Sequence, residues 1–227
     1  MKKILITFNQ KWSEYFLEVL VITIGILGAF TLNNWNETLK ANADENRFLT
    51  EILDNLKEDR VQLLQAEKQL DNSVQSILFM MNNELTTMPD STLNRHIALF
   101  INFYKYYSID NAYETLKSSS TRISNDDLRN AISRYYEYEQ NRTASGLKDI
   151  EVQFITYLLP FARIHLESFE WLTEGIPKKR DAEFHTALQA ELFAAKDNNS
   201  QSLAALRRFL DSNQLLQEKI EKEIGKS

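Results

Sequence analysis

The sequence predicts an all-α protein in which one N-terminal transmembrane helix is followed by an extramembrane antiparallel helical bundle with long helices. Three observations lead to this prediction. An apolar run occupies Tyr15–Leu32, a seven-residue repeat of apolar side chains follows it, and the 227 residues include only 5 glycines and 3 prolines. Folds built from short strands and tight turns use many more of both residues, so the composition favours helices with few connections.

The apolar run is long enough, at roughly 18 residues, to cross about 30 Å of hydrocarbon as a helix. Trp12 and Trp35 lie at its borders, where aromatic side chains suit the membrane–water interface. Lysines precede the run, and no basic residue follows it before Lys40, so the positive-inside rule places the N-terminus in the cytoplasm. A cleaved signal peptide and a buried core helix are the two alternatives. We therefore expect a cytoplasmic N-terminus over 1–14, a transmembrane anchor over 15–35 and a helical periplasmic domain over 36–227.

One face of the expected anchor is suited to association with another helix. Helical spacing places Glu18, Ile22, Gly25 and Ala29 on this face. Gly25 and Ala29 form a small-xxx-small pattern that allows close approach, and an ionisable group inside a span is costly without a partner. The expected partners are thus the lipid bilayer and either a second copy of the chain or another membrane protein. The alternative is a hydrated Glu18 near the border beside incidental small residues.

A long helix with a coiled-coil-like seam is predicted after the anchor. Its signal is a strict seven-residue repeat of apolar residues. These residues are Leu49, Leu56, Leu63, Leu70 and Ile77. A second line, with Ile52, Ala66 and Met80, is interrupted by Asp59 and Ser73. The interruptions favour one helix of a bundle, closed by later segments, over a free-standing two-stranded coil.

The remaining chain predicts further helices and no strand. Ser124 and Asp127 resemble a capping box that begins a long helical region, in which Gly146 and Pro160 are candidate bends. The other expected elements are a short helix from the turn at Pro89 to about Tyr107, a second over 110–118, a turn at 175–177, a helix over 181–195, a loop at 197–200 and a last helix.

Catalytic and metal-binding motifs are missing from the sequence. There is no cysteine, and the three histidines lack the spacing of helical metal ligands. Nucleotide-binding glycine patterns and a nucleophile elbow are absent as well. A net charge of −6 argues against nucleic acid as a partner. We therefore expect neither an enzyme nor a bound cofactor or metal.

A binding surface is predicted where hydroxyl-rich residues adjoin tyrosines. Its candidate residues are Tyr113, Lys117, Ser118, Ser119 and Tyr135. Clustered aromatic side chains line ligand pockets in some helical proteins and fill the core in many others, so core packing is the alternative.

Two stretches of sequence resemble one known family. The first ends the anchor with Asn33, Asn34, Trp35 and Asn36, and the second runs from Tyr113 to Ser119 and continues to the pair at 135–136. Both resemble a bacterial family of uncharacterised single-span membrane proteins, whose pattern usually has Gly where this chain has Ser120. The resemblance implies an inner-membrane anchor with a helical periplasmic domain, and it implies no activity.

Three functions are consistent with these features. A membrane-anchored protein–protein interaction or scaffold module is favoured by the association-prone anchor face and the heptad repeat. The alternative is a ligand-sensing bundle, which is suggested by the aromatic residues beside a polar turn. The short stretch of about 14 residues before the span weakens this alternative, because the signal would then need a partner that carries the output domain. An envelope hydrolase ranks third.

Overall fold

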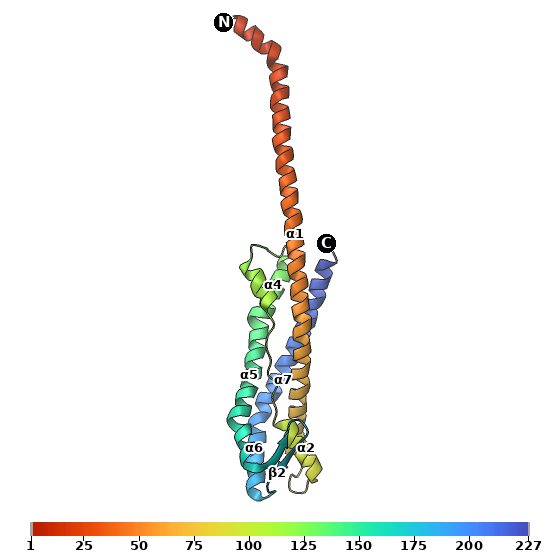
Figure 1. The fold of residues 1–227 in the computed structure, drawn as a ribbon, viewed down its shortest axis with the longest axis vertical. Coiled ribbons are helices and arrows are strands. Elements are labelled where there is room, and N and C mark those ends of the chain that lie inside the picture. Colours follow the sequence, from red (N-terminus) through yellow and green to blue (C-terminus); the bar gives the residue numbers. More distant parts are fainter. Residues whose placement is uncertain (1, 227) are drawn as a thin grey trace. The chain divides into compact units, whose positions relative to one another are not determined.

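The computed structural model describes residues 2–226, with the side chains of residue 12 and residues 15–226 (Figure 1). The predicted all-α character is confirmed, with one short hairpin added. The elements are α1 (Lys2–Asn82), α2 (Asp90–Phe100), α3 (Asn111–Ser118), α4 (Asp126–Arg134), η1 (Tyr135–Gln140), α5 (Asn141–Gln153), η2 (Phe154–Leu158), α6 (Leu159–His165), β1 (Leu166–Glu170), β2 (Glu174–Pro177) and α7 (Ala182–Ile224). The η segments are π-helical.

The chain divides into two compact units, residues 1–47 and residues 48–226. The first unit is part of α1, and every side chain from Tyr15 to Asp44 is exposed. Phe16, Ile26 and Trp35, for example, have exposed fractions of 60%, 65% and 63%. No other part of the described chain covers this apolar segment, and by length and composition it is the one described helix able to cross a membrane.

The heptad residues of α1 form the core of the second unit. Leu49, Leu56 and Leu63 are fully buried, and they share one hydrophobic cluster with Leu206 and Phe209 of α7. The seven-residue spacing aligns them because it nearly matches two helical turns. The interruptions of the second heptad line face inward too, since Asp59 and Ser73 are both buried.

Hydrogen bonds and ion pairs fix the pairing of α1 with α7. Arg207 Nε lies 2.7 Å from an oxygen of Glu67, and further along α1 the Ser73 hydroxyl accepts a bond from Asn199. Towards the start of the unit, Asn213 donates to the carbonyl of Leu56. Residue numbers rise along α1 while they fall along α7, so the two helices run in opposite directions.

A continuous helical region runs from α4 to α6, as predicted, but it changes pitch at different places from those expected. The turns widen at η1 and η2, whereas α5 is regular through Gly146. Pro160 lies directly after η2, as the second residue of α6. Proline has no N–H to donate to the preceding turn, and a widened turn accommodates that missing bond.

Two predicted helix boundaries are wrong. The helix α2 ends at Phe100 rather than near Tyr107, and the following residues are extended to Asp110. The cap of α4 is Asn125 instead of Ser124: the Asn125 side chain accepts a hydrogen bond from the N–H of Leu128. Asparagine is as good an N-cap residue as serine, so sequence alone does not choose between neighbours.

The C-terminal predictions also need correction. Residues 197–200 form no loop, because α7 runs through them without a break. Asn199 is buried there against Ser73, so the polar run that suggested a loop supplies a core contact. The expected turn at 175–177 is β2, which pairs antiparallel with β1. Gly175 is needed in this strand because a Cβ there would lie 2.7 Å from Cγ2 of the buried Ile97.

Two glycine substitutions test this packing in opposite directions. We expect Gly175→Ala to destabilise the fold by about 1–3 kcal/mol, because its methyl group must displace Ile97. Gly146→Ala is the matched control: its Cβ meets only Ser202 Oγ at 3.6 Å, so a gain of about 0.5–1 kcal/mol in helix propensity should appear. Denaturant unfolding of the full-length chain in mild detergent measures both. Equal effects of the two substitutions would contradict the close contact at Gly175.

Candidate functional site

A buried carboxylate, Asp59, is the centre of a polar network inside the second unit. The hydroxyls of Tyr106 and Tyr135 donate to it at 2.8 and 3.0 Å. The amide of Gln140 adds a longer contact of 3.5 Å. Burial raises the pKa of Asp59 above its ordinary value of 3.8, and these hydrogen bonds oppose the rise. Asp59 itself is fully buried, so its carboxylate offers no surface to a substrate.

The π-helical segment η1 supplies two of these donors. Tyr135 and Gln140 are five residues apart, a spacing that a π-helix brings closer to one face than an α-helix does. Asn213 of α7 completes the network by donating to the hydroxyl of Tyr135 at 2.8 Å. Burial raises the pKa of Tyr135 strongly, and the nearby Asp59 adds to this effect. Tyr135 therefore stays protonated and remains a donor to Asp59.

A cleft of about 180 Å³ coincides with most of the predicted binding surface. Tyr113, Lys117 and Ser119 line it, together with residues of the following loop and α4. Its three cations all have carboxylate partners: Lys117 pairs with Glu114 and Glu137, while Arg122 and Arg129 both pair with Asp126. A hydrogen bond from Tyr113, with the Lys117 contact, lowers the pKa of Glu137. The cleft is therefore close to neutral.

Two residues predicted for that surface lie elsewhere. Ser118 donates to the carbonyl of Glu114 within its own helix, and Tyr135 is buried with 1% of its surface exposed. Tyr136 lies between the cleft and the buried Tyr135. Its ring stacks on that of Tyr113, with 4.7 Å between the ring centroids, and meets the ring of Tyr135 edge-on at 5.0 Å. For these buried tyrosines, core packing is the interpretation that holds.

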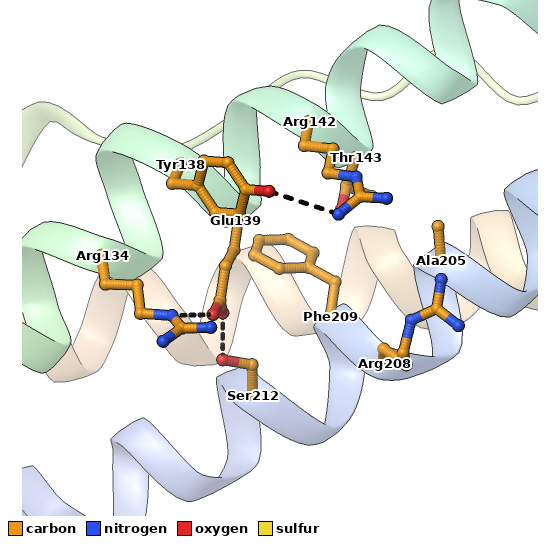
Figure 2. Close-up of a pocket in the computed structure, with 9 residues that line it drawn as sticks. All are labelled: Arg134, Tyr138, Glu139, Arg142, Thr143, Ala205, Arg208, Phe209 and Ser212. Atoms are coloured by element: carbon orange, nitrogen blue, oxygen red, sulfur yellow. Dashed lines mark hydrogen bonds and ion pairs between the residues drawn. The ribbon is translucent and has the colours of Figure 1, made fainter.

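A second cleft, of about 250 Å³, has a different character (Figure 2). It lies where η1 and α5 meet α7, and its floor includes the buried ring of Phe209. At one end, Glu139 accepts from Arg134 Nε at 2.8 Å and from the hydroxyl of Ser212. Arg142 and Arg208 lie at the other end. The lining thus holds three guanidinium groups and one carboxylate. No local sequence pattern marks this cleft, because its walls are far apart in the chain.

The residues of the predicted anchor face are all exposed. Glu18, Ile22, Gly25 and Ala29 lie on α1, and a Cβ added at Gly25 would meet nothing within 4 Å. At the border motif, Asn33 donates to Glu37 at 2.9 Å, while Asn34, Trp35 and Asn36 are exposed. Contacts within the described chain therefore do not explain the small residues of this face.

Two of the three histidines pack against aromatic rings. His96 stacks on Phe79 at 4.1 Å and contacts Ser76, and His165 lies against Phe161 at 5.0 Å. Among the residues with described side chains, no group of histidines and carboxylates is arranged to hold a metal ion. Ser120, which stands where the family pattern has glycine, does not adopt a positive φ; Leu172 is the one non-glycine residue within 2–226 that does.

The buried position of Asp59 predicts a pH-dependent stability. An acid whose pKa is raised by folding stabilises the native state below its unfolded pKa, and that contribution is lost as the pH rises through the folded pKa. Asp59→Asn removes the titration, so the stability advantage of the natural chain over the variant should shrink from pH 4 upwards, by at most about 1.4 kcal/mol per pH unit. Denaturant unfolding from pH 4 to 7 measures the difference. If the stability of the natural chain relative to Asp59→Asn instead grew with pH, the raised pKa of Asp59 would be contradicted.

Comparison with known proteins gives one match. The family described as a family of unknown function (DUF6090) matches residues 18–148. The matched range contains the apolar segment of α1, the heptad residues, the Tyr113 cleft and the η1 wall of the arginine-lined cleft. No curated protein and no solved structure matches the chain. Because the matched range covers more than half of the 227 residues, the chain belongs to this family of unknown function.

Proposed function

We propose that the chain is a single-pass protein of the bacterial inner membrane and that it acts there as a protein–protein interaction or scaffold module. In this proposal residues 1–14 lie in the cytoplasm, residues 15–35 cross the bilayer, and the antiparallel helical bundle lies in the periplasm. The family assignment is compatible with this function and adds no activity of its own.

The exposed apolar segment of α1 is the observation that carries the proposal. Its large side chains, from Phe16 to Leu32, are mostly more than half exposed, which in water would forfeit roughly 1.5–3 kcal/mol for each such side chain left unburied. A hydrocarbon environment removes this cost, and a helix satisfies its own backbone hydrogen bonds there. The following residues to Asp44 are as exposed but mostly polar, as expected outside the bilayer.

The interaction role is supported by a small residue of α1 that the packing of the chain does not require. Gly25 has open space around it, so no contact within the described chain requires a small residue at this position. The buried Asp59 network, by contrast, is satisfied internally and closed to solvent. Surface contacts are therefore better candidates for function than interior chemistry.

The predicted topology can be tested because the chain contains no cysteine. Ser13→Cys and Ser120→Cys each introduce a single thiol, and Ser120 is exposed. With the outer membrane of a bacterial host permeabilised, a membrane-impermeant maleimide should label Ser120→Cys, whereas Ser13→Cys should react only after the inner membrane is lysed. Labelling of both thiols before lysis would contradict a membrane-spanning α1, and the reverse pattern would invert the proposed orientation.

Association through the anchor face predicts that added bulk at Gly25 disrupts it. We expect Gly25→Leu to lower the yield of specific crosslinks in intact cells several-fold, because a leucine prevents close approach of a second helix. Thr23→Leu is the control, since Thr23 lies about 160° around the helix from Gly25 and gains similar apolar bulk. If both variants crosslinked as the natural chain does, this face would not be the contact surface.

Ligand sensing is the second candidate function, and the cleft of Figure 2 favours it. A helical bundle that binds a small molecule between η1, α5 and α7 would change the packing of α7 against α1.

A further inference from the structure

We propose that the cleft lined by Arg134, Arg142 and Arg208 binds a compact phosphate-type dianion. The inference goes beyond the proposed function and does not depend on membrane anchoring. It rests on unpaired positive charge, on the hydroxyl groups beside it and on the size of the cleft.

Two guanidinium groups of the cleft have no counter-ion. Among the residues with described side chains, no carboxylate lies within ion-pair distance of Arg142 or Arg208. The nearest polar contact of Arg142 is the hydroxyl of Tyr138, at 3.4 Å. Arg207, next in sequence to Arg208, pairs with both Glu67 and Asp71, whereas Arg60, Arg95 and Arg163 also lie outside ion-pair distance of a described carboxylate. What distinguishes this cleft is that two such guanidinium groups line it together, in a chain whose net charge is −6.

The two unpaired arginines come from facing helices and reach towards the same end of the cleft (Figure 2). Arg142 belongs to α5 and Arg208 to α7. Guanidinium groups present rigid forks of N–H donors that match the oxygens of phosphate and carboxylate ligands. The two guanidinium groups carry two positive charges and several N–H donors. They therefore suit a ligand with two negative charges and several acceptor oxygens that is small enough for a cleft of about 250 Å³.

The third arginine is held by a carboxylate of the chain itself. Glu139 binds Arg134 and accepts from Ser212, so it occupies one end of the cleft much as an anionic ligand would. Phe209 lies between this ion pair and the Arg142–Arg208 end. The negative charge of Glu139 also repels an incoming anion. Glu139 therefore weakens anion binding in the natural chain, and its removal should strengthen binding.

Solvent exposure limits the expected affinity. Arg142 and Arg208 are both exposed, so water and salt screen their attraction for an anion. We expect inorganic phosphate to bind with a Kd on the order of a millimolar, weakening as ionic strength rises. Nucleic acid is a poorer fit, because the chain's net negative charge opposes an extended polyanion.

The first arm of the test uses the full-length chain in nanodiscs of zwitterionic lipid. Inorganic phosphate is titrated at constant ionic strength against chloride, and binding is followed by calorimetry and by the increase in melting temperature. We expect Arg142→Gln with Arg208→Gln to weaken phosphate binding by about tenfold or more. We expect Glu139→Gln to tighten it several-fold. Arg163→Gln, which removes one exposed positive charge outside the cleft, should leave the Kd unchanged.

The second arm replaces part of the lipid with phosphatidic acid, whose head group carries the same phosphate monoester, and omits free phosphate. Stabilisation in the first arm identifies a soluble anion as the source, and stabilisation in the second arm alone identifies a lipid head group. Either result supports the site only if the arginine variants reduce it and Glu139→Gln increases it. No binding in either arm, or equal binding by all variants, overturns the proposal. Should the arginine double variant fail to fold, the single variants Arg142→Gln and Arg208→Gln take its place beside Glu139→Gln.

Discussion

The contact between α1 and α7 is the interaction on which the second unit depends. Apolar residues at heptad spacing close most of this interface, and polar residues meet at two levels within it. At one level Asp59 and Asn213 are joined through Tyr135, and at the other Ser73 meets Asn199. Leaving such a buried group unsatisfied costs roughly 1–3 kcal/mol, so the polar contacts fix the register of the two helices. A shift by one heptad would separate the polar pairs, because Asn199 and Asn213 each stand seven residues from Leu206 along α7.

The π-helical segment η1 follows from the same constraint. Asp59 needs several donors in a small volume, and Tyr106, Tyr135 and Gln140 reach it from two separate segments. The extended residues after α2 run beside α1, where Tyr104 donates to Gln65 and Tyr106 to Asp59. A widened turn then brings Tyr135 and Gln140 towards one side. Two irregular parts of this chain, the segment after α2 and η1, therefore supply the donors of its buried carboxylate.

Periodic features were predictable from sequence, and long-range ones were not. The heptad line identified α1 and its buried leucines, because a repeat records which face is apolar. The same line showed Asp59 and Ser73 as interruptions without revealing Asn213 or Asn199, whose pairing depends on tertiary contacts. Asn199 was misassigned to a loop because buried and exposed asparagines look alike in sequence. Three of five predicted surface residues line the Tyr113 cleft, since they belong to one local segment. The cleft of Figure 2 joins residue 134 to residue 212, and no local pattern marks it.

The main interior groups of this protein have partners within the chain, whereas some exposed groups do not. Inside the second unit, the apolar face of α1 is covered and its buried acid has donors, so the chain supplies what these groups need. Two groups of exposed side chains that lie together lack such a complement within the described residues: the run of apolar side chains from Phe16 to Leu32, and the guanidinium groups of Arg142 and Arg208 in one cleft. The first needs a hydrocarbon or apolar neighbour, and the second needs an anion. Groups that already have partners within the chain gain little free energy from binding another molecule. Groups without such partners gain more, so these two surfaces are the best candidates for interaction with other molecules.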